Sequence, residues 1–408
     1  MIQVVNVFLH QHYDKIHVGR LAYKEGKIYF EYDEKFLKEG VNLSPYKVPL
    51  KSGVRICDDD LFEGLFGLFA DSLPDGWGRL LLDRHFLKKS IDYHKITPLD
   101  RLSYIGQYGV GALSYEPIDE ELSCSEESEI SLDELAGASL EILSGSTDIM
   151  LEQLLLLGGS SAGARPKVMI QLSSDKKNIL SGSNKLRNTY EHWMVKFTSS
   201  MDTKDSGKIE YIYSLLAKEV GIKMSETCLL KGKKESYFAT KRFDRVGDRR
   251  VHIHSVAGLA HSDFRAPTLD YDDLLTLTLH LTKDVNELQM MFKIACFNLY
   301  MHNRDDHAKN FSFMLDDENC WKLAPAYDLT FSYGIGTEHS TMYLGEGKTP
   351  TTEHLLKLGK KHSIKDASKV ALQIRKISFK FKEYAKEFKV TNSSSKLVEK
   401  SIENLLID

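Results

Sequence analysis

The sequence predicts a two-lobed α+β fold, with strands concentrated near the beginning of the chain and helices in its second half. At 408 residues the chain exceeds the length that one hydrophobic core usually supports, so two or three packed units are expected. Residues 3–32 alternate apolar and polar side chains between short polar breaks, which predicts a small antiparallel sheet. From residue 270 onward apolar residues recur at helical spacing, so the second half is predicted to be mostly α-helical.

Shorter patterns predict further elements. Residues 73–76 (LPDG) are a turn signal between two helical patterns, and Asp75 is placed to cap the second helix. Residues 206–221 have the apolar spacing of a helix, and residues 236–242 have the composition of a strand. From 360 to 390, lysines interleave with apolar residues, which predicts an amphipathic helix whose basic face is more simply a solvated face than a binding patch.

Changes of composition divide the chain into four expected segments. Residues 1–118 would form an N-terminal subdomain, and 119–146, rich in Glu, Asp and Ser, an acidic connector. Residues 147–248 contain a Gly/Ser loop and two predicted strands, and 249–408 would form the helical lobe.

The overall composition is that of an ordinary globular protein. Hydrophobic residues at 42% and charged residues at 27% argue against a disordered or collagen-like chain. A formal net charge of −4 gives no overall attraction to nucleic acid, so DNA contact is expected only through a partner. The sequence lacks an apolar run long enough for a membrane helix and a recognisable signal peptide, and its five scattered cysteines include no CxxC pair. We therefore expect a cytoplasmic protein with reduced thiols and no membrane contact.

The most informative segment for chemistry is HNRDDHAKNFSFML, residues 302–315. Asp305 and Asn310 are five residues apart, as in the catalytic loop of protein kinases, where the Asp accepts the proton of a substrate hydroxyl and the Asn holds magnesium. Asp328, in LAPAYDLTFS, could coordinate a metal ion that bridges the phosphates. Considered singly, Asp305 is more simply a helix cap and Asp328 a turn residue. Their order and separation favour phosphoryl transfer.

A lysine upstream of these acids fits the same chemistry. Lys196 lies in the apolar strand pattern WMVKF and could pair with the α- and β-phosphates of ATP. The alternative is a lysine on an edge strand that extends to solvent.

The loop LGGSSAGARPKVMI precedes that strand. Its glycines allow close approach to an anion, its two serines add hydroxyl groups, and Arg165 and Lys167 add positive charge. The loop matches neither the P-loop nor GxGxxG, and a loop of this kind is by itself more often a simple connection. Its position ahead of Lys196 favours a role in phosphate binding.

Several separated blocks resemble those of HipA-family serine/threonine kinases, the toxins of bacterial toxin–antitoxin pairs. The blocks are SLPDGWGRLLLDR, RLSYIGQYGVGAL, GGSSAGARPK, KRFDR, HNRDDHAKNFSF and LAPAYDLT. The resemblance covers nearly the whole chain. It implies a two-lobed, protein-kinase-like fold with a β-rich N-terminal subdomain and a mostly α-helical C-terminal lobe, in which residues 147–248 cover the nucleotide.

The resemblance also assigns roles to individual residues. It implies that Asp305 is the catalytic Asp, that Asn310 and Asp328 hold Mg²⁺, and that Lys196 pairs with the phosphates. The residues that it places against ATP are Ser160, Ser161, Gly163, Ala164, Arg165, Lys167, Lys196, His307 and Lys309. Ser160 corresponds to the serine whose autophosphorylation inactivates members of the family, and Ser161 is a second candidate for this modification.

The chain departs from the family pattern at two places. Residues 250–264 read RVHIHSVAGLAHSDF where many members have a segment like RxHxEDF, which weakens any transfer of substrate identity. The Gly/Ser loop reads SSAGARPK instead of SxAGAQEK, so its nucleotide contacts and its regulatory serine can differ in detail.

The function implied by the resemblance is that of an ATP- and Mg²⁺-dependent serine/threonine protein kinase. As a toxin it would inhibit translation by phosphorylating a protein such as an aminoacyl-tRNA synthetase. It would bind a HipB-like helix-turn-helix antitoxin and contact DNA only through that partner. Two alternatives stay open: a small-molecule kinase, and a non-enzymatic partner of a DNA-binding antitoxin. The presence of every catalytic acid favours an enzyme.

Overall fold

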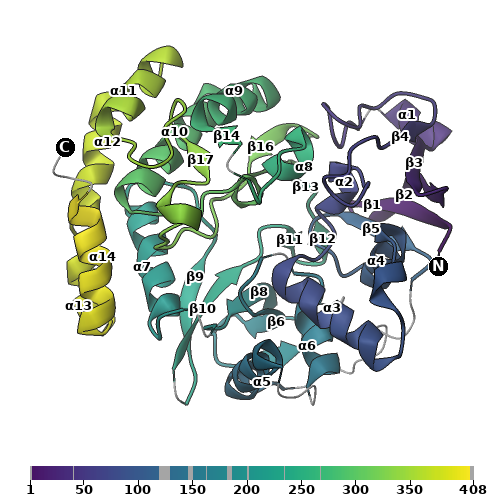
Figure 1. The fold of residues 1–408 in the computed structure, drawn as a ribbon, viewed down its shortest axis with the longest axis horizontal. Coiled ribbons are helices and arrows are strands. Elements are labelled where there is room, and N and C mark those ends of the chain that lie inside the picture. The colour runs from purple at the N-terminus through teal and green to yellow at the C-terminus, as the bar shows by residue number, and fades with distance from the viewer. Residues whose placement is uncertain are drawn as a thin grey trace. The chain divides into compact units, whose positions relative to one another are not determined.

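The chain begins with a five-stranded sheet (Figure 1). Its strands pair antiparallel in the order β4-β3-β2-β1-β5, where β1 is Val4–Gln11, β2 Asp14–Lys24, β3 Lys27–Tyr32, β4 Arg55–Ile56 and β5 Leu113–Glu116. Alternate residues of β1, namely Val5, Val7 and Leu9, are buried, so the apolar face of the sheet forms a core. The predicted N-terminal sheet is therefore confirmed.

The computed structural model describes most of the chain. The described residues are 2–39, 41–118, 129–145, 150–161, 163–181, 186–199, 202–233, 235–266 and 268–404. Contacts between residues divide the chain into two compact units. Unit 1 comprises Met1–Met201, Leu230–His254 and Gly258–His261, and unit 2 comprises Asp202–Leu229, Ser255–Ala257 and Ser262–Asp408.

Unit 1 contains a second group of strands after the Gly/Ser loop. Neighbouring antiparallel strands follow the order β7-β6-β8-β10, where β6 is Lys167–Ser173, β7 Ile179–Ser181, β8 Tyr190–Lys196 and β10 Ser236–Lys241. Every residue of β6 is buried, as expected of a strand inside a sheet. A short hairpin follows, formed by β11 (Arg245–Val246) and β12 (Arg249–Arg250).

The helices of unit 1 are short or of moderate length. They are α1 (Glu34–Glu39), α2 (Gly67–Ala70), α3 (Gly76–Lys88), η1 (Tyr93–Lys95), α4 (Pro98–Ile105), α5 (Leu132–Ser144) and α6 (Leu151–Gly158). The expected helices on both sides of residues 73–76 are confirmed as α2 and α3. Helix α6 packs against both α3 and β6, as Figure 1 also shows for α3 and α6.

Helix α5 lies within the segment that the composition predicted as an acidic connector, residues 119–146. The helix forms because Ser131 caps it by accepting a hydrogen bond from the backbone N–H of Glu134, and because Leu135 and Ile142 are buried on one side. Glu134 and Glu141 are exposed, and Asp133 accepts hydrogen bonds from the Tyr237 hydroxyl group and the backbone N–H of Lys233. A charged composition here is therefore compatible with an ordered amphipathic helix. Residues 119–128 and 146 lie outside the described residues.

Unit 2 is mostly helical, as predicted. Its helices are α7 (Ser206–Glu219), α9 (Tyr271–Thr282), α10 (Val285–Tyr300), η3 (Ala308–Asn310), η4 (Ile335–Thr337), α11 (Thr352–Lys361), α12 (Ala367–Ser378), α13 (Phe381–Glu387) and α14 (Asn392–Asn404). Helix α10 packs against α9 and α12, and its last seven residues are all buried. It is therefore the central helix of this unit.

Four short strands complete unit 2. Strands β14 (Leu269–Asp270) and β17 (Thr341–Met342) pair parallel, and β15 (Ser312–Leu315) and β16 (Trp321–Leu323) form an antiparallel pair. Three further elements span the residues at which the chain passes from one unit to the other: β9 (Thr227–Lys231), β13 (Ile253–Ser255) and α8 (Val256–Ala260).

The lysine-rich segment 360–390 contains the end of α11 and all of α12 and α13, instead of the single amphipathic helix expected. Ser363 and Asp366 both have positive φ, which cannot continue a right-handed helix, so α11 and α12 are separate. The apolar side of α12, which includes Ala371 and Ile374, is nevertheless buried as the spacing predicted.

Two expectations from composition concern membranes and thiols. In the part of the chain that the structure describes, no helix has the length and apolar character needed to cross a bilayer. Among the described residues, Cys57, Cys228, Cys296 and Cys320 form no disulfide bond, whereas Cys124 lies outside the described residues.

Candidate active site

The loop after α10 in unit 2 carries the predicted catalytic residues. It is closed by a hydrogen bond, because the side-chain amide of Asn310 donates to the backbone carbonyl of Asp305 over 2.7 Å. Helix η3 ends the loop and is capped by His307, whose Nδ1 accepts from the backbone N–H of Lys309. The cap of this short helix is thus His307, and the alternative of Asp305 as a helix cap does not hold. The hydrogen bond from Asn310 to Asp305 also fixes the Asn310 amide beside the backbone of Asp305.

The second ring nitrogen of His307 faces the predicted catalytic carboxylate. Nε2 lies 3.8 Å from Oδ1 of Asp305, which is beyond direct hydrogen-bond distance but within the range of an electrostatic contact. Since Nδ1 accepts a hydrogen bond, a neutral His307 carries its proton on Nε2, the nitrogen on the Asp305 side. The geometry supports an orienting role for His307 toward Asp305.

Phe264 packs against this loop within unit 2. Its ring centroid is 5.9 Å from that of His307, and the ammonium of Lys309 lies 4.2 Å from the centre of the Phe264 ring. Arg265 also lies over this ring. Phe264 belongs to the segment in which the chain departs from the family pattern, so part of that segment contacts the loop predicted to be catalytic.

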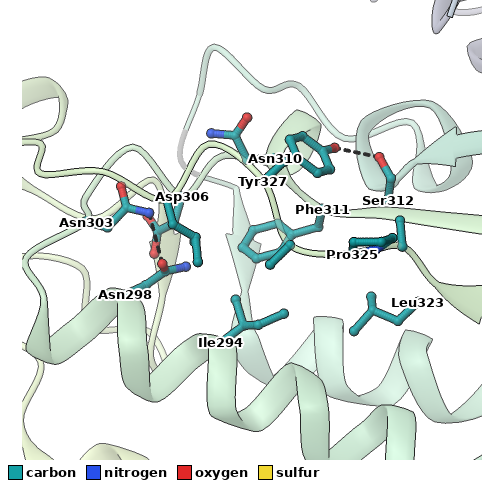
Figure 2. Close-up of a pocket in the computed structure, with 13 residues that line it drawn as sticks. Ile294, Asn298, Asn303, Asp306, Asn310, Phe311, Ser312, Leu323, Pro325 and Tyr327 are labelled. Atoms are coloured by element: carbon teal, nitrogen blue, oxygen red, sulfur yellow. Dashed lines mark hydrogen bonds between the residues drawn. The ribbon is translucent and has the colours of Figure 1, made fainter. Parts of the chain in front are cut away.

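The segment before Asp328 is tied to the same loop. The hydroxyl group of Tyr327 donates to the backbone carbonyl of Lys309 over 2.6 Å. The hydroxyl group of Ser312 lies 2.6 Å from the Tyr327 hydroxyl group (Figure 2). The backbone N–H of Ala326 donates to the carbonyl of Lys223. The HAKNFS and APAYDL blocks, separate in the sequence, are therefore joined by Tyr327, which places Asp328 next to a fixed residue.

The backbone of Asp328 itself has an uncommon conformation. Its φ is +55°, in the left-handed region, which costs a residue other than glycine about 1–2 kcal/mol, although Asp tolerates it better than most. Such residues concentrate at functional sites, where the surrounding structure holds them. Aspartate also adopts this conformation in ordinary turns, so the backbone is compatible with either role of Asp328.

Asp306 is a residue of this loop that the sequence analysis missed. Its side chain is fully buried, in contrast to the half-exposed carboxylate of the neighbouring Asp305. Oδ2 accepts from the Tyr271 hydroxyl group and lies 2.9 Å from His339 Nδ1, and Oδ1 accepts from the backbone N–H groups of Ser340 and Thr341. Burial, with the Asp306 carboxylate nearby, raises the pKa of Tyr271 well above its ordinary value, so the hydroxyl group stays a donor.

This buried network continues to the beginning of the loop. The Asn303 amide donates to Asn298 Oδ1 over 2.9 Å, and the Asn298 amide donates to the Tyr271 hydroxyl group over 2.8 Å. Figure 2 shows Asn298, Asn303 and Asp306 together beside a pocket that Asn310 also lines. The network thus holds residues on both sides of Asp305. The available sequence signal was Asn298, a polar residue within an otherwise apolar stretch of helix.

His302, at the beginning of the loop, is a buried histidine that is expected to make unit 2 sensitive to acid. Burial, with Arg304 nearby, lowers the pKa of His302 to about 4, and Nδ1 lies 3.1 Å from the carbonyl of Ser332. An unfolded histidine titrates near 6.5, so the stability that depends on neutral His302 is complete above pH 6.5 and is lost as pH falls from 6.5 toward 4.

A His302→Asn variant tests this dependence on pH, because Asn keeps a donor and tolerates the positive φ of this position. Between pH 7 and pH 4 the unfolding free energy of the variant should fall by about 2–3 kcal/mol less than that of the unmodified protein. Urea unfolding at both pH values checks this, and equal losses would contradict it.

The predicted loop residues 160–167 and Lys196 lie in unit 1. Helix α6 ends at Gly158, and the Ser161 hydroxyl group donates to the Gly158 carbonyl over 2.6 Å. Ser161 is fully buried, whereas Ser160 is half-buried and Ala164 is exposed. Ala162 lies outside the described residues. The two candidate serines therefore differ in accessibility, which the sequence did not distinguish.

Lys167 and Lys196 form a pair in the sheet of unit 1. They are directly opposite each other in the antiparallel register of β6 and β8, on one face of the sheet. Lys167 is buried, and its amine lies close to Gly163. The amine of Lys196 is 5.9 Å from the ring centre of Phe238, its partner on β10. Strand β8 lies between β6 and β10, so Lys196 is not on an edge strand.

Lys167 and Lys196, opposite each other in the sheet, and the nearby glycine loop are of the residue types that bind phosphate groups. In unit 2 the oxygens of Asp305, Asn310 and Asp328 are of the type that Mg²⁺ prefers. Across the described ranges, no group of three or more His, Cys, Asp or Glu is placed to hold a metal ion. Mg²⁺ at phosphate sites commonly uses only one or two carboxylates, with phosphate oxygens completing its coordination.

Comparison with known proteins identifies both halves of the chain. Residues 8–116 match the HipA N-terminal domain, and residues 159–395 match the HipA-like C-terminal domain. The protein is thus of the class that carries these two domains in this order. It belongs to the HipA family, as the sequence blocks predicted.

Solved structures bear on the fold. HipA of Shewanella oneidensis MR-1, solved in a complex with HipB and its operator DNA, is similar to this chain with a TM-score of 0.69 at 17% identity, over 98% of this chain and 96% of that one. This likeness confirms the predicted fold class. The Helicobacter pylori proinflammatory kinase CtkA matches with a TM-score of 0.34 at 15% identity, over 56% of this chain and 94% of that one.

Proposed function

We propose that this protein is an ATP- and Mg²⁺-dependent serine/threonine protein kinase and the toxin of a bacterial toxin–antitoxin pair. The observation that carries this proposal is the closed loop of unit 2. The Asn310 amide donates to the backbone carbonyl of Asp305, and Tyr327, the residue directly before Asp328, donates to the backbone carbonyl of Lys309 in the same loop. A kinase needs these three side chains, a base and two metal ligands, held together by a rigid frame.

In the proposed reaction Asp305 accepts the proton of a serine or threonine hydroxyl group. The hydroxyl oxygen forms a bond to the γ-phosphorus of ATP, the bond from that phosphorus to the β–γ bridging oxygen breaks, and ADP leaves. Asn310 and Asp328 would hold Mg²⁺, which when bound neutralises charge on the phosphates. Lys167 and Lys196 would bind the phosphates from the sheet of unit 1.

The proposed partners follow from the family. HipA of Shewanella oneidensis was solved with HipB and operator DNA, which supports a HipB-like helix-turn-helix antitoxin as the partner of this chain and an indirect contact with DNA. The proposed target is a protein of translation such as an aminoacyl-tRNA synthetase. Ser160 is the proposed site of autophosphorylation, because its half-buried side chain is more accessible than that of Ser161.

Phosphate-resolved mass spectrometry after incubation with ATP tests this function. We expect phosphate on Ser160 in the presence of Mg²⁺, at least about 100-fold less when the metal is removed with EDTA, and none at this position in a Ser160→Ala variant. Restoring Mg²⁺ after EDTA treatment is the control. ATP binding without any phosphorylated protein would favour a small-molecule kinase, and absence of both would favour a non-enzymatic partner of an antitoxin.

A further inference from the structure

Two segments of unit 1 that lie far apart in the sequence meet at the Gly/Ser loop. The first is the turn Asp75–Gly78, which consists of the N-cap residue and the first helical residues of α3. The second is the Gly/Ser loop, which runs from Gly158 at the end of α6 to Lys167 at the beginning of β6. The backbone N–H of Gly163 donates to Oδ1 of Asp75, and the N–H of Trp77 donates to the Gly163 carbonyl over 3.0 Å. The loop residue Gly163 is thus held on both its donor and its acceptor side.

Two glycines of the turn are required by this contact. A Cβ at Gly76 would lie 2.6 Å from the carbonyl oxygen of Gly163, and a Cβ at Gly78 would lie 2.5 Å from that of Ser161. Both distances are shorter than real Cβ contacts, and Gly76 also has a φ of +45°. The glycines of the DGWG motif therefore permit the backbone of the Gly/Ser loop to lie directly against the beginning of α3.

The side chain of Asp75 binds the loop and does not cap α3. It occupies the N-cap position of α3, where the sequence predicted a capping role, but its side chain makes no capping hydrogen bond to that helix. The prediction of a cap was therefore wrong, and the carboxylate instead accepts from Gly163. A charged acceptor makes a stronger bond to a backbone N–H than a neutral one.

We propose that the turn Asp75–Gly78 is a latch that holds the Gly/Ser loop in its nucleotide-binding position, with Asp75 as the positioning residue. In this position Gly163 lies against the amine of Lys167, which is opposite Lys196 in the sheet. The latch thus connects the N-terminal domain to the phosphate-binding residues of the same unit. Its effect on nucleotide binding rests on the proposed function, whereas its effect on the loop does not.

Hydrogen exchange without nucleotide tests the latch directly. We expect amides in residues 158–167 to exchange about tenfold faster in full-length Asp75→Ala than in the unmodified protein, because a hydrogen bond to a charged group is lost. Asp75→Asn retains an oxygen acceptor and should restore most of the protection. Asp83→Ala is the matched control, since Asp83 lies on the same helix and pairs with Arg79.

Binding of ATP, measured by calorimetry on the same variants, tests the positioning role. We expect the dissociation constant for ATP to rise about tenfold in Asp75→Ala and to stay near its original value in Asp75→Asn and Asp83→Ala. Gly78→Ala, which pushes the loop away without removing a charge, should act like Asp75→Ala, and thermal unfolding checks that each variant is folded.

The outcomes separate the latch from the kinase. Unchanged exchange in folded Asp75→Ala and Gly78→Ala would overturn the latch, whatever the activity. Faster exchange with an unchanged ATP affinity would overturn the positioning role. If the unmodified protein neither bound ATP nor became phosphorylated while exchange still responded to Asp75→Ala, the holding contact would be supported and the proposed function would fail.

Discussion

Replacing Asp305 with alanine is expected to lower the rate of ATP-dependent phosphorylation by about 1,000-fold while leaving the protein folded. A positioned general base contributes about 10²–10⁴-fold to a proton transfer. The loss should mainly affect activity, since the Asp305 carboxylate is about half-exposed and substitutions at exposed positions change stability little. The bond that closes the loop uses the backbone carbonyl of Asp305, which alanine retains.

Phosphorylation of Ser160, followed over time by mass spectrometry, measures this effect. Asp317→Ala is the matched control, because Asp317 is an exposed aspartate in a turn of the same unit, and we expect it to act like the unmodified protein. The same pair of variants extends to cells, where Asp305→Ala should no longer arrest growth. A folded Asp305→Ala protein that kept its rate would show that the base is another residue.

The sequence blocks that predicted the family mark contacts between distant segments. The PDGWG turn meets the Gly/Ser loop through Asp75 and Gly163, and the HAKNFS and APAYDL blocks meet through Tyr327. In the same way Arg245 of the KRFDR block donates to the backbone carbonyls of Gly109 and Gly111, which belong to the RLSYIGQYGVGAL block. Short motifs could be recognised in the sequence, but the pairing of one motif with another depends on the folded chain.

The roles of individual acids were harder to predict because they depend on partners from other elements. Asp305 and Asp306 are adjacent and chemically identical, and only the structure separates them. Asp306 is enclosed by Tyr271 and His339, which are distant in sequence, whereas Asp305 is half-exposed. Asp75 likewise has the position of a helix cap in the sequence, yet its carboxylate accepts a hydrogen bond from Gly163, 88 residues further along the chain. Local patterns predicted helices and strands well, since periodicity is a local property.

Replacing Asp306 with alanine is expected to lower the unfolding free energy of unit 2 by about 3–5 kcal/mol, because removing one partner of a buried charged network leaves the others unsatisfied. The backbone N–H groups of Ser340 and Thr341 and the hydroxyl group of Tyr271 would all lose their acceptor. Asp306→Asn should also lower the unfolding free energy, because the NH₂ group of Asn would face hydrogen-bond donors at a position where the carboxylate oxygen accepts.

Hydrogen exchange of α10 peptides at increasing urea concentration measures the stability of unit 2, because these buried helical amides open only when the unit unfolds. Tyr271→Phe is the graded comparison. It removes a single donor to Asp306 and should cost about 1–2 kcal/mol. Asp305→Ala should change stability by less than about 0.5 kcal/mol, as expected of a surface substitution. If Asp306→Ala were as stable as Asp305→Ala, the network would not hold the loop, and the contrast between the two neighbouring acids would have to lie in catalysis alone.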